Sequence, residues 1–285
     1  MDLRAIEVTD GVDAVRAGFT PEFVALDNGQ LVGCTALRWW DEADGTRLYL
    51  LLGWVEPVFR GRGHGREILA WQENQAREHL AAHPTAGPAM YGGNPRDDDP
   101  GIEALLRAAG YEIAFTRIQL TLELDGAPLV DLPAGIELRA ASADHHRDVF
   151  AANAEVFNDR SLGYVQDTFE EFEREAADDF PDHELWTLAY AGNQLAGWVI
   201  SAEDEDGVAD TPWVGVRPAF RRRGLASALL RVNHAQLLDH GIHTSGIWTL
   251  EENPNGSVAL YESLGYRRSA RQPRYRKPIQ GRHKT

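Results

Sequence analysis

Two short glycine-rich segments are the part of this 285-residue sequence whose residue types point most directly to chemistry. In each, a run of β-branched and aromatic residues ends at a proline, and an Arg-x-x-Gly-x-Gly/Ala pattern follows. Small residues let backbone N–H groups approach a phosphate closely, and the dipole of a following helix favours its negative charge. The pattern therefore predicts two sites for a phosphorylated ligand. Their residues are Val55, Arg60, Gly61, Arg62, Gly63, His64 and Gly65 in the first segment, and Arg221, Arg222, Arg223, Gly224, Leu225 and Ala226 in the second.

The two segments lie 161 residues apart, and the predicted elements around them occur in the same order. Each half contains strands, the glycine loop, a helix, a strand, a second helix and closing strands, which in the first half are a pair near residues 116–124. The helices after the loops are expected at residues 66–80 and 225–239. Residues 125–135 are rich in glycine and proline and form a linker. The chain is therefore interpreted as a duplication with domains at residues 1–126 and 134–285.

The two halves differ most between their first two predicted strands. This segment covers residues 9–22 in the first half but residues 140–185 in the second. The extra length predicts two helices. Only the second half therefore contains a segment long enough to line a substrate pocket. Residues 167–184 within it hold nine carboxylates and one arginine. They indicate either a binding surface for a cationic ligand or a solvated helix face with Phe169 and Phe172 buried beneath it.

Composition and charge limit the classes of partner. The net charge is −16, although residues 267–285 carry eight basic and no acidic side chains. Such a field repels nucleic acid and favours an amine-bearing partner, unless it only keeps the protein in solution. No apolar run is long enough to cross a bilayer, and no signal peptide precedes the first strand, so we expect a cytoplasmic protein. Cys34 is the only cysteine, which fits a reducing compartment, and no motif predicts a metal site.

The second half also contains Asn253 and the run Leu260-Tyr261-Glu262-Ser263-Leu264-Gly265-Tyr266. Together with the Val-x-Pro-x-x-Arg-x-x-Gly-x-Ala loop, this run resembles the GNAT N-acetyltransferase superfamily. The first half matches the loop pattern too, so the resemblance covers nearly the whole chain. The tandem layout is similar to that of mycothiol synthase and related actinobacterial enzymes, in architecture only. The resemblance implies an α/β fold of two tandem domains, each a mixed, mostly antiparallel twisted sheet flanked by helices.

The resemblance further implies acetyl-CoA as co-substrate. Its pyrophosphate would lie on the amides of residues 222–226, and its pantetheine arm would pair with the strand edge at Val214 and Val216. Asn253 resembles the residue that bonds the pantetheine amides, or else it only forms a turn before a helix. The loop of the first half would hold a second CoA pyrophosphate, or it is retained because a strand must meet a helix closely there.

Tyr261 occupies the family's position for the general acid that protonates the departing thiolate. The alternative is a tyrosine packed between helix and sheet. In the first half, Tyr111 corresponds to Tyr266, and counting back five residues from it reaches Leu106, which cannot donate a proton. Catalysis is therefore expected in the second half.

The general base is a choice among several carboxylates. Asp210 lies 11 residues before Arg221, where histone-acetylating family members carry a glutamate. It shares a face with Val214 and Val216 only if Pro212 does not shift the register of the strand. The other candidates are Glu155, Glu203 and Glu205, or a chain of water molecules.

We therefore expect an acetyl-CoA-dependent N-acetyltransferase whose C-terminal half acts on a primary amine that is small and cationic. A protein N-terminus is the other acceptor considered. The alternative function is a non-catalytic acyl-CoA-binding sensor or regulatory module. Neither nucleic acid nor a membrane is an expected partner, and the protein is expected to be a monomer or homodimer.

Overall fold

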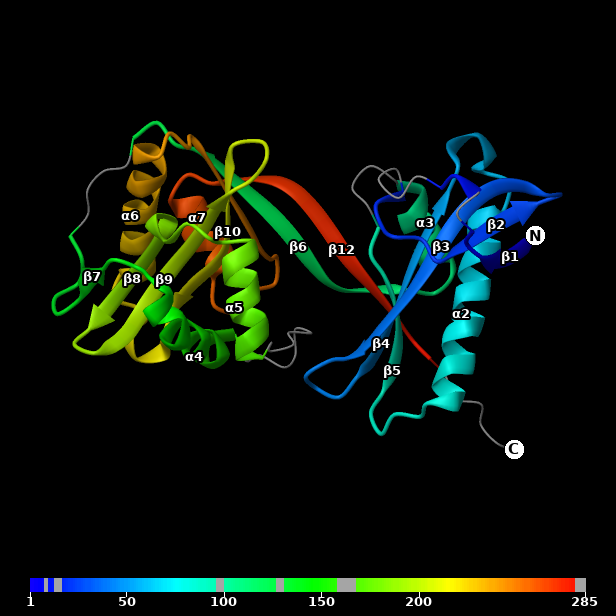
Figure 1. Cartoon of the computed structure of the whole chain (residues 1–285), viewed down its shortest axis with the longest axis horizontal. Coiled ribbons are helices and arrows are strands. Elements are labelled where there is room, and N and C mark those ends of the chain that lie inside the picture. Colours follow the sequence, from blue (N-terminus) through cyan, green and yellow to red (C-terminus); the bar gives the residue numbers. More distant parts are fainter. Residues whose placement is uncertain (8–9, 13–16, 96–99, 127–130, 158–167, 280–285) are drawn as a thin grey trace. The chain divides into compact units, whose positions relative to one another are not determined.

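The structure is a computed structural model that describes residues 1–7, 10–12, 17–95, 100–126, 131–157 and 168–279. It divides into two compact units. The N-terminal unit comprises Met1–Thr116 and Gln272–Thr285, and the C-terminal unit comprises Arg117–Arg271. Each unit is a sheet with helices on its faces (Figure 1).

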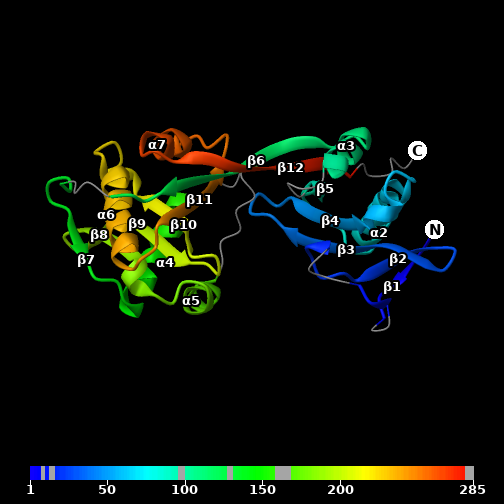
Figure 2. The same cartoon turned by 90° about the horizontal axis from the view of Figure 1, so that it is seen from above.

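The N-terminal unit orders its strands β1-β2-β3-β4-β5-β12. All neighbouring pairs that are described are antiparallel except β4 and β5, which are parallel. Asn28 and Gly29 both have positive φ, +49° and +78°, so they form a tight hairpin between β2 and β3 (Figure 2). The strands are β1 (Asp2–Ala5), β2 (Phe23–Asp27), β3 (Gln30–Asp41), β4 (Arg47–Val55), β5 (Ala89–Gly93) and the end of β12 (Arg267–Pro278).

Among the described residues of this unit, two helices lie beside the sheet, α2 (His64–Ala82) and α3 (Pro100–Ala108). The sheet-facing side of α2 buries Ile68, Leu69 and Ala76. Ile68 packs with Ala25 and Val32 of the sheet. The helix was predicted to begin at residue 66. It begins two residues earlier, at His64, directly after Gly63.

The C-terminal unit orders its strands β6-β11-β10-β9-β8-β7. Here β10 and β11 are the parallel pair, and the other pairs are antiparallel. The sheet is therefore mixed and mostly antiparallel, as predicted. The strands are β6 (Glu112–Glu123), β7 (Glu137–Arg139), β8 (Trp186–Ala191), β9 (Gln194–Glu203), β10 (Val208–Val216) and β11 (Thr244–Leu250).

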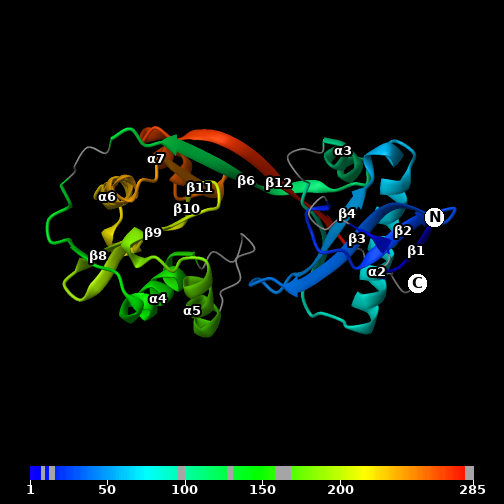
Figure 3. The same ribbon diagram turned by 45° about the horizontal axis from the view of Figure 1, so that its top comes forward.

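Helices cover both faces of this second sheet (Figure 3). The first face carries α6 (Leu225–Asp239) and α7 (Ser257–Ser263), whose apolar residues pack with Ala189 and Val199. The opposite face carries α4 (His146–Phe157) and α5 (Phe169–Asp178), which pack with Leu188 and Trp198. The two helices predicted for the long segment of the second half are therefore confirmed.

The two units exchange strands. The end of β6 pairs with β11 in the C-terminal unit, with Arg117 opposite Leu250 and Glu123 opposite Thr244. The end of β12 pairs with β5 in the N-terminal unit, with Tyr275 opposite Gly93. The expected strand pair near residues 116–124 is wrong, because one continuous strand of 12 residues is found there. The compact units therefore divide the chain differently from the sequence repeat.

Candidate active site

Strands β10 and β11 separate beside the second glycine loop and leave an open strand edge. They pair in parallel only over Val208–Asp210 and Thr244–Gly246. On its other side, β10 stays paired with β9 up to Val216. Among the described strands, none pairs with β10 on the β11 side beyond Asp210. Such an edge offers backbone donors and acceptors to an extended ligand, and Val214 and Val216 lie along it.

A β-bulge at Pro212 sets the direction of the Asp210 side chain. The register between β9 and β10 shifts between Asp210 and Trp213, so that Asp210 pairs with Ala202 and Trp213 with Ile200. Asp210 therefore shares a face with Trp213 and lies on the opposite face from Val214. The condition for Asp210, Val214 and Val216 to share one face, an unshifted register at Pro212, is therefore not met.

Asp210 is placed well for a base. It is half-buried at the last position where β10 pairs with β11, and the two parallel strands separate beyond it. Burial raises the pKa of its carboxyl, and the nearby Asp204 acts in the same direction, while a bond from the Thr211 N–H and the charge of Arg117 act against them. A carboxylate with a raised pKa accepts a proton more readily at neutral pH. Its role stays a prediction.

The two glycine loops are built alike. The Arg221 Nε donates to the carbonyl of Val216 at 2.9 Å, and the Arg60 Nε donates to the carbonyl of Val55 at 3.1 Å. Each arginine thus fastens its loop to the end of the preceding strand. This use of its Nε leaves the rest of the loop backbone to face a ligand.

Each loop ends in a glycine with positive φ that starts the following helix. Gly63 has a φ of +98° and Gly224 a φ of +78°. Arg222 also lies in this left-handed region at +61°, where the first loop has Gly61 at +76°. Because the first N–H groups of a helix have no intrahelical partner, these turns present donors and the positive end of the helix dipole. The arrangement fits an anion.

Tyr261 lies on α7 and is 5% exposed. Its ring packs in a core cluster with Ile247 of β11 and lies 5.8 Å from the ring of Tyr266. Burial raises the pKa of its phenol. The phenol therefore stays protonated at neutral pH, as a proton donor must. The packing role and the acid role are compatible, and the acid role stays a prediction.

The structure places Leu106 at the position of Tyr261 in the other unit. The Tyr111 N–H donates to the Leu106 carbonyl at 3.0 Å, and the Tyr266 N–H donates to the Tyr261 carbonyl at 3.1 Å. These bonds close the same turn at the end of α3 and of α7. The correspondence drawn from the sequence is therefore confirmed.

Asn253 forms a turn before α7. Its Oδ1 accepts a hydrogen bond from the Asn255 N–H at 2.9 Å, and Gly256 at the start of the helix follows directly. The turn-forming interpretation is confirmed. A further bond from its amide to pantetheine stays a prediction.

Glu155 is engaged in an ion pair. Its Oε2 lies 2.8 Å from Nε of Arg217, which connects α4 to the residue that precedes the second glycine loop. The carboxylate of Glu155 is thus held by a cationic side chain of the protein itself. Glu203 and Glu205 are exposed. The structure therefore favours Asp210 over these candidates.

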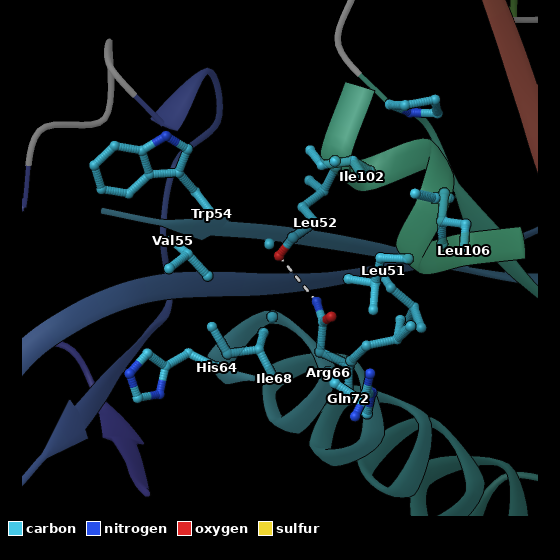
Figure 4. Close-up of a pocket in the computed structure, with 18 of the residues that line it drawn as sticks. Leu51, Leu52, Trp54, Val55, His64, Arg66, Ile68, Gln72, Ile102 and Leu106 are labelled. Carbon is cyan, nitrogen blue, oxygen red and sulfur yellow. Dashed lines mark hydrogen bonds between the residues drawn. The ribbon is translucent and has the colours of Figure 1, made fainter. Parts of the chain in front are cut away.

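The N-terminal unit has the same separation of strands and a large cavity at it. Strands β4 and β5 pair only over Arg47–Leu50 and Ala89–Gly92, whereas β4 stays paired with β3 up to Val55. The cavity has a volume of about 700 Å³ and extends from the first glycine loop to α3. Its lining includes Trp54, Val55, His64, Ile102 and Leu106 (Figure 4).

One wall of this cavity is held by a buried glutamine. The Gln72 Nε2 donates to the Leu52 carbonyl at 2.9 Å (Figure 4) and to the Ala36 carbonyl at 3.2 Å. The end of the cavity at α3 is apolar, with Leu105 and Leu106. The cavity thus combines an anion-binding loop with an apolar end that has no phenol at the position of Leu106.

Sequence reasoning missed an aromatic wall on the Asp210 face of the C-terminal unit. The ring of Phe157 on α4 lies 5.4 Å from that of Trp213 and 6.4 Å from that of Trp198. The residue types were visible, but the bulge at Pro212 decides the face of Trp213. No pattern in the sequence gave that face.

In the described residues 168–184, the acidic segment has its carboxylates in solvent and apolar side chains buried beneath them, as one of the two interpretations predicted. Phe172 and Ala176 are buried, whereas Glu170, Glu173 and Asp178 are exposed. Glu171 closes a capping box with Thr168, and these bonds lower the pKa of its carboxyl. The attraction of a cationic acceptor stays a prediction.

The described residues contain neither a membrane-spanning helix nor a cluster of metal ligands. No helix among them is long and apolar enough to span a membrane. No three histidine, cysteine, aspartate or glutamate side chains of that part gather as a metal site would require.

The family model "Acetyltransferase (GNAT) family" matches residues 9–87 and 151–266. These two stretches contain the two glycine loops and most of the separated strands. The chain belongs to the GNAT family and is an acetyltransferase with two tandem GNAT domains.

Curated relatives carry a more particular name. A mycothiol acetyltransferase of Thermomonospora curvata is 26% identical over 269 residues, which cover 93% of this chain and 84% of the relative. A mycothiol acetyltransferase of Thermobispora bispora is 30% identical over 231 residues, which cover 75% of this chain and 71% of the relative.

Solved structures share the fold. A GCN5-related N-acetyltransferase from Sphaerobacter thermophilus has a TM-score of 0.74 at 22% identity, over 95% of this chain and 83% of the other. A tandem GNAT protein from the clavulanic acid biosynthesis pathway has a TM-score of 0.64 at 20% identity, over 91% and 82%. The predicted tandem α/β architecture is confirmed.

Proposed function

We propose that the C-terminal unit transfers an acetyl group from acetyl-CoA to a primary amine, with Asp210 and Tyr261 as base and acid. The observation that supports this most is the open edge of β10, which has Asp210 at its start and the glycine loop at its end. The family membership and the curated mycothiol acetyltransferases support the same reaction class.

The residues present fit acetyl-CoA. The amides of residues 222–226 and the start of α6 would hold its pyrophosphate, and the arginine side chains 222 and 223 would add positive charge. The β10 edge at Val214 and Val216 would pair with its pantetheine arm. When bound, acetyl-CoA supplies an activated acyl group with a good leaving group.

The proton transfers follow from the two environments. Asp210 would accept a proton from the ammonium form of the acceptor, and the neutral amine then attacks the acyl carbon. The carbon–nitrogen bond forms as the carbon–sulfur bond breaks. Tyr261 would donate its proton to the departing sulfur, because its buried phenol is neutral. The nitrogen then loses its surplus proton, which restores the Tyr261 phenol, and Asp210 releases its proton to solvent. The products are therefore the acetamide, CoA thiol and one proton.

A small molecule is the acceptor that we propose, in line with the names of the curated relatives. The half-buried Asp210 carboxylate and the aromatic wall of Phe157 and Trp213 would receive it. The cytoplasm is the proposed compartment, because the single cysteine is a buried free thiol.

Release of CoA thiol from acetyl-CoA, measured with a panel of primary amines, tests the proposed function. Tyr261→Phe should lower kcat by about a hundredfold or more and leave acetyl-CoA binding nearly unchanged. Asp210→Asn should lower kcat/KM most at low pH, where the ammonium form dominates.

Tyr266→Phe is the matched control for this test. It removes bonds to His234 and Ser245 from the same core, so it should lower stability while the chemical step is largely kept. Equal losses of kcat in the Tyr261 and Tyr266 variants would show that packing, and not proton donation, explains the effect.

The N-terminal unit supports a second role, the binding of acyl-CoA without turnover. Its cavity reaches an intact glycine loop, whereas Leu106 replaces the tyrosine. Calorimetry on Gly224→Asp should still detect one CoA site, and Gly63→Asp should remove the other. A folded Gly224→Asp protein that binds no CoA would contradict this second role.

A further inference from the structure

A buried asparagine on the Asp210 side of the C-terminal sheet has no described role. Asn153 lies on α4 and is 3% exposed. It falls on the same side of the helix as Val149 and Val156, which pack against the sheet. Helix α4 lies against β9 and β10. Asn153 is therefore a polar residue in an otherwise apolar layer.

Neither polar atom of the Asn153 side chain has a hydrogen-bond partner. An amide buried in this way costs folding free energy, because it gives up its bonds to water and gains none in return. Nearly all buried polar groups in proteins are paired, and exceptions occur preferentially at functional sites. An amide without partners in the free protein is suited to bind a ligand that supplies them.

A second unpaired group lies in the same layer. The indole of Trp198 on β9 is fully buried, and its Nε1–H has no partner. The ring occupies the space above Gly215, where a Cβ would lie 2.2 Å from it. Phe157, one helical turn after Asn153, contacts this indole and that of Trp213. In this layer the Asn153 Nδ2 and the Trp198 Nε1 are donors without a hydrogen-bond partner, and the Asn153 Oδ1 is an acceptor without one.

We infer that Asn153 recognises an uncharged polar group of the acceptor, next to the amine that reacts. This inference rests on the proposed function of the C-terminal unit. A carbonyl or hydroxyl oxygen can accept from the Asn153 Nδ2, and an adjacent N–H or O–H can donate to the Asn153 Oδ1. An amide or a hydroxyl beside the amine satisfies these groups, whereas a simple alkylamine leaves them unpaired.

The site separates two tasks within the acceptor pocket. Asp210 would receive the ammonium group and Asn153 the neighbouring neutral group, since Asp210 lies on the face of the sheet against which α4 packs. The carboxylate sets the class of the reacting group. The buried amide sets which amines are accepted.

The test begins with the stability of two leucine variants. Asn153→Leu keeps the size of the side chain and removes an unpaired amide, so it should raise the melting temperature by about 2–4 °C or leave it unchanged. Asn233→Leu is the matched control, because the buried Asn233 amide is fully used. Its Nδ2 donates to the Leu185 carbonyl at 3.0 Å, and its Oδ1 accepts from Ser201 Oγ at 2.9 Å. That variant should melt well below the wild type.

The second arm measures recognition with three small amines: glycinamide, ethanolamine and propylamine. Asn153→Leu should lower kcat/KM for glycinamide and ethanolamine by about tenfold or more, and change that for propylamine less than about twofold. The same amines are titrated into the CoA-bound protein, and the rise in melting temperature reports binding without turnover. Glycinamide should stabilise the wild type more than it stabilises Asn153→Leu.

Each result decides a separate question. A melting temperature of Asn153→Leu as low as that of Asn233→Leu would show that the amide is already satisfied, and would overturn the inference. Equal effects of Asn153→Leu on all three amines, in turnover and in thermal shift, would also overturn it. Failure of the wild type to release CoA with any amine, while glycinamide still stabilises it selectively, would contradict the proposed function and leave the recognition site standing.

Discussion

Replacing Gly215 by alanine tests the packing that supports the acceptor face. The added Cβ would lie 2.2, 2.5 and 2.5 Å from three atoms of the Trp198 ring, all far below contact distance. Trp198 is fully buried, so the ring cannot move out to solvent. Overpacking of this kind costs about 1–3 kcal/mol. The lower backbone entropy of alanine in the unfolded chain offsets about 0.5–1 kcal/mol of that cost.

The net cost of about 0.5–2 kcal/mol predicts a fall in melting temperature of about 1–8 °C, since 1 kcal/mol corresponds to about 2–4 °C for a chain of this size class. Near-ultraviolet circular dichroism should also change, because the ring must turn. Gly246→Ala on the neighbouring strand is the control, as the nearest atom to its Cβ lies at 3.6 Å. If Gly215→Ala has the same melting temperature as Gly246→Ala and the wild type, the placement of the Trp198 ring is refuted.

Three further predictions concern other parts of the C-terminal unit. Burial, together with the charge of Arg231, lowers the pKa of His234 to about 4, below the value near 6.5 of an unfolded chain, so the unfolded state binds the proton first. The free energy of unfolding should therefore fall by about 3 kcal/mol between pH 6.5 and pH 4, and urea titrations of His234→Gln should show a flatter dependence. Arg222 has a φ of +61°, a conformation that glycine adopts without strain, so Arg222→Gly should change the free energy of unfolding by less than about 1 kcal/mol. Arg223→Gly should lower the free energy of unfolding by about 1 kcal/mol in the same chemical denaturation experiment. If the exposed carboxylates of α5 attract the acceptor, kcat/KM should fall as the salt concentration rises. The double variant Glu170→Gln with Glu173→Gln should show a weaker dependence on salt. A double variant with the same salt dependence as the wild type would contradict the electrostatic interpretation.

The sequence predicted the parts of the fold that depend on local pattern. The glycine loops and α6 were expected at the residues where they occur, because proline, glycine and the helical period define them locally. The equivalence of Leu106 and Tyr261 also followed from spacing alone. These features need no information about distant contacts.

Features set by pairing between distant segments could not be predicted in the same way. The face of Asp210 depends on how β9 compensates for the bulge at Pro212, and the sequence of β10 does not contain that register. Glu155 was a candidate base until the structure placed Arg217 beside it, although the two residues lie far apart in the sequence. The single long β6 was mistaken for two strands, because its partners β11 and β12 follow much later in the chain.

The exchange of strands has a consequence for the history of the duplication. A deletion of residues 1–126 would remove β6, which pairs with β11 in the unit that contains Tyr261. The surviving half would then expose an unpaired strand edge, which is a route to aggregation. Selection that acts only on the half with the tyrosine therefore preserves the half with the leucine as well. The strand that β6 supplies to β11 is a reason, independent of catalysis, for the chain to keep the half with the leucine.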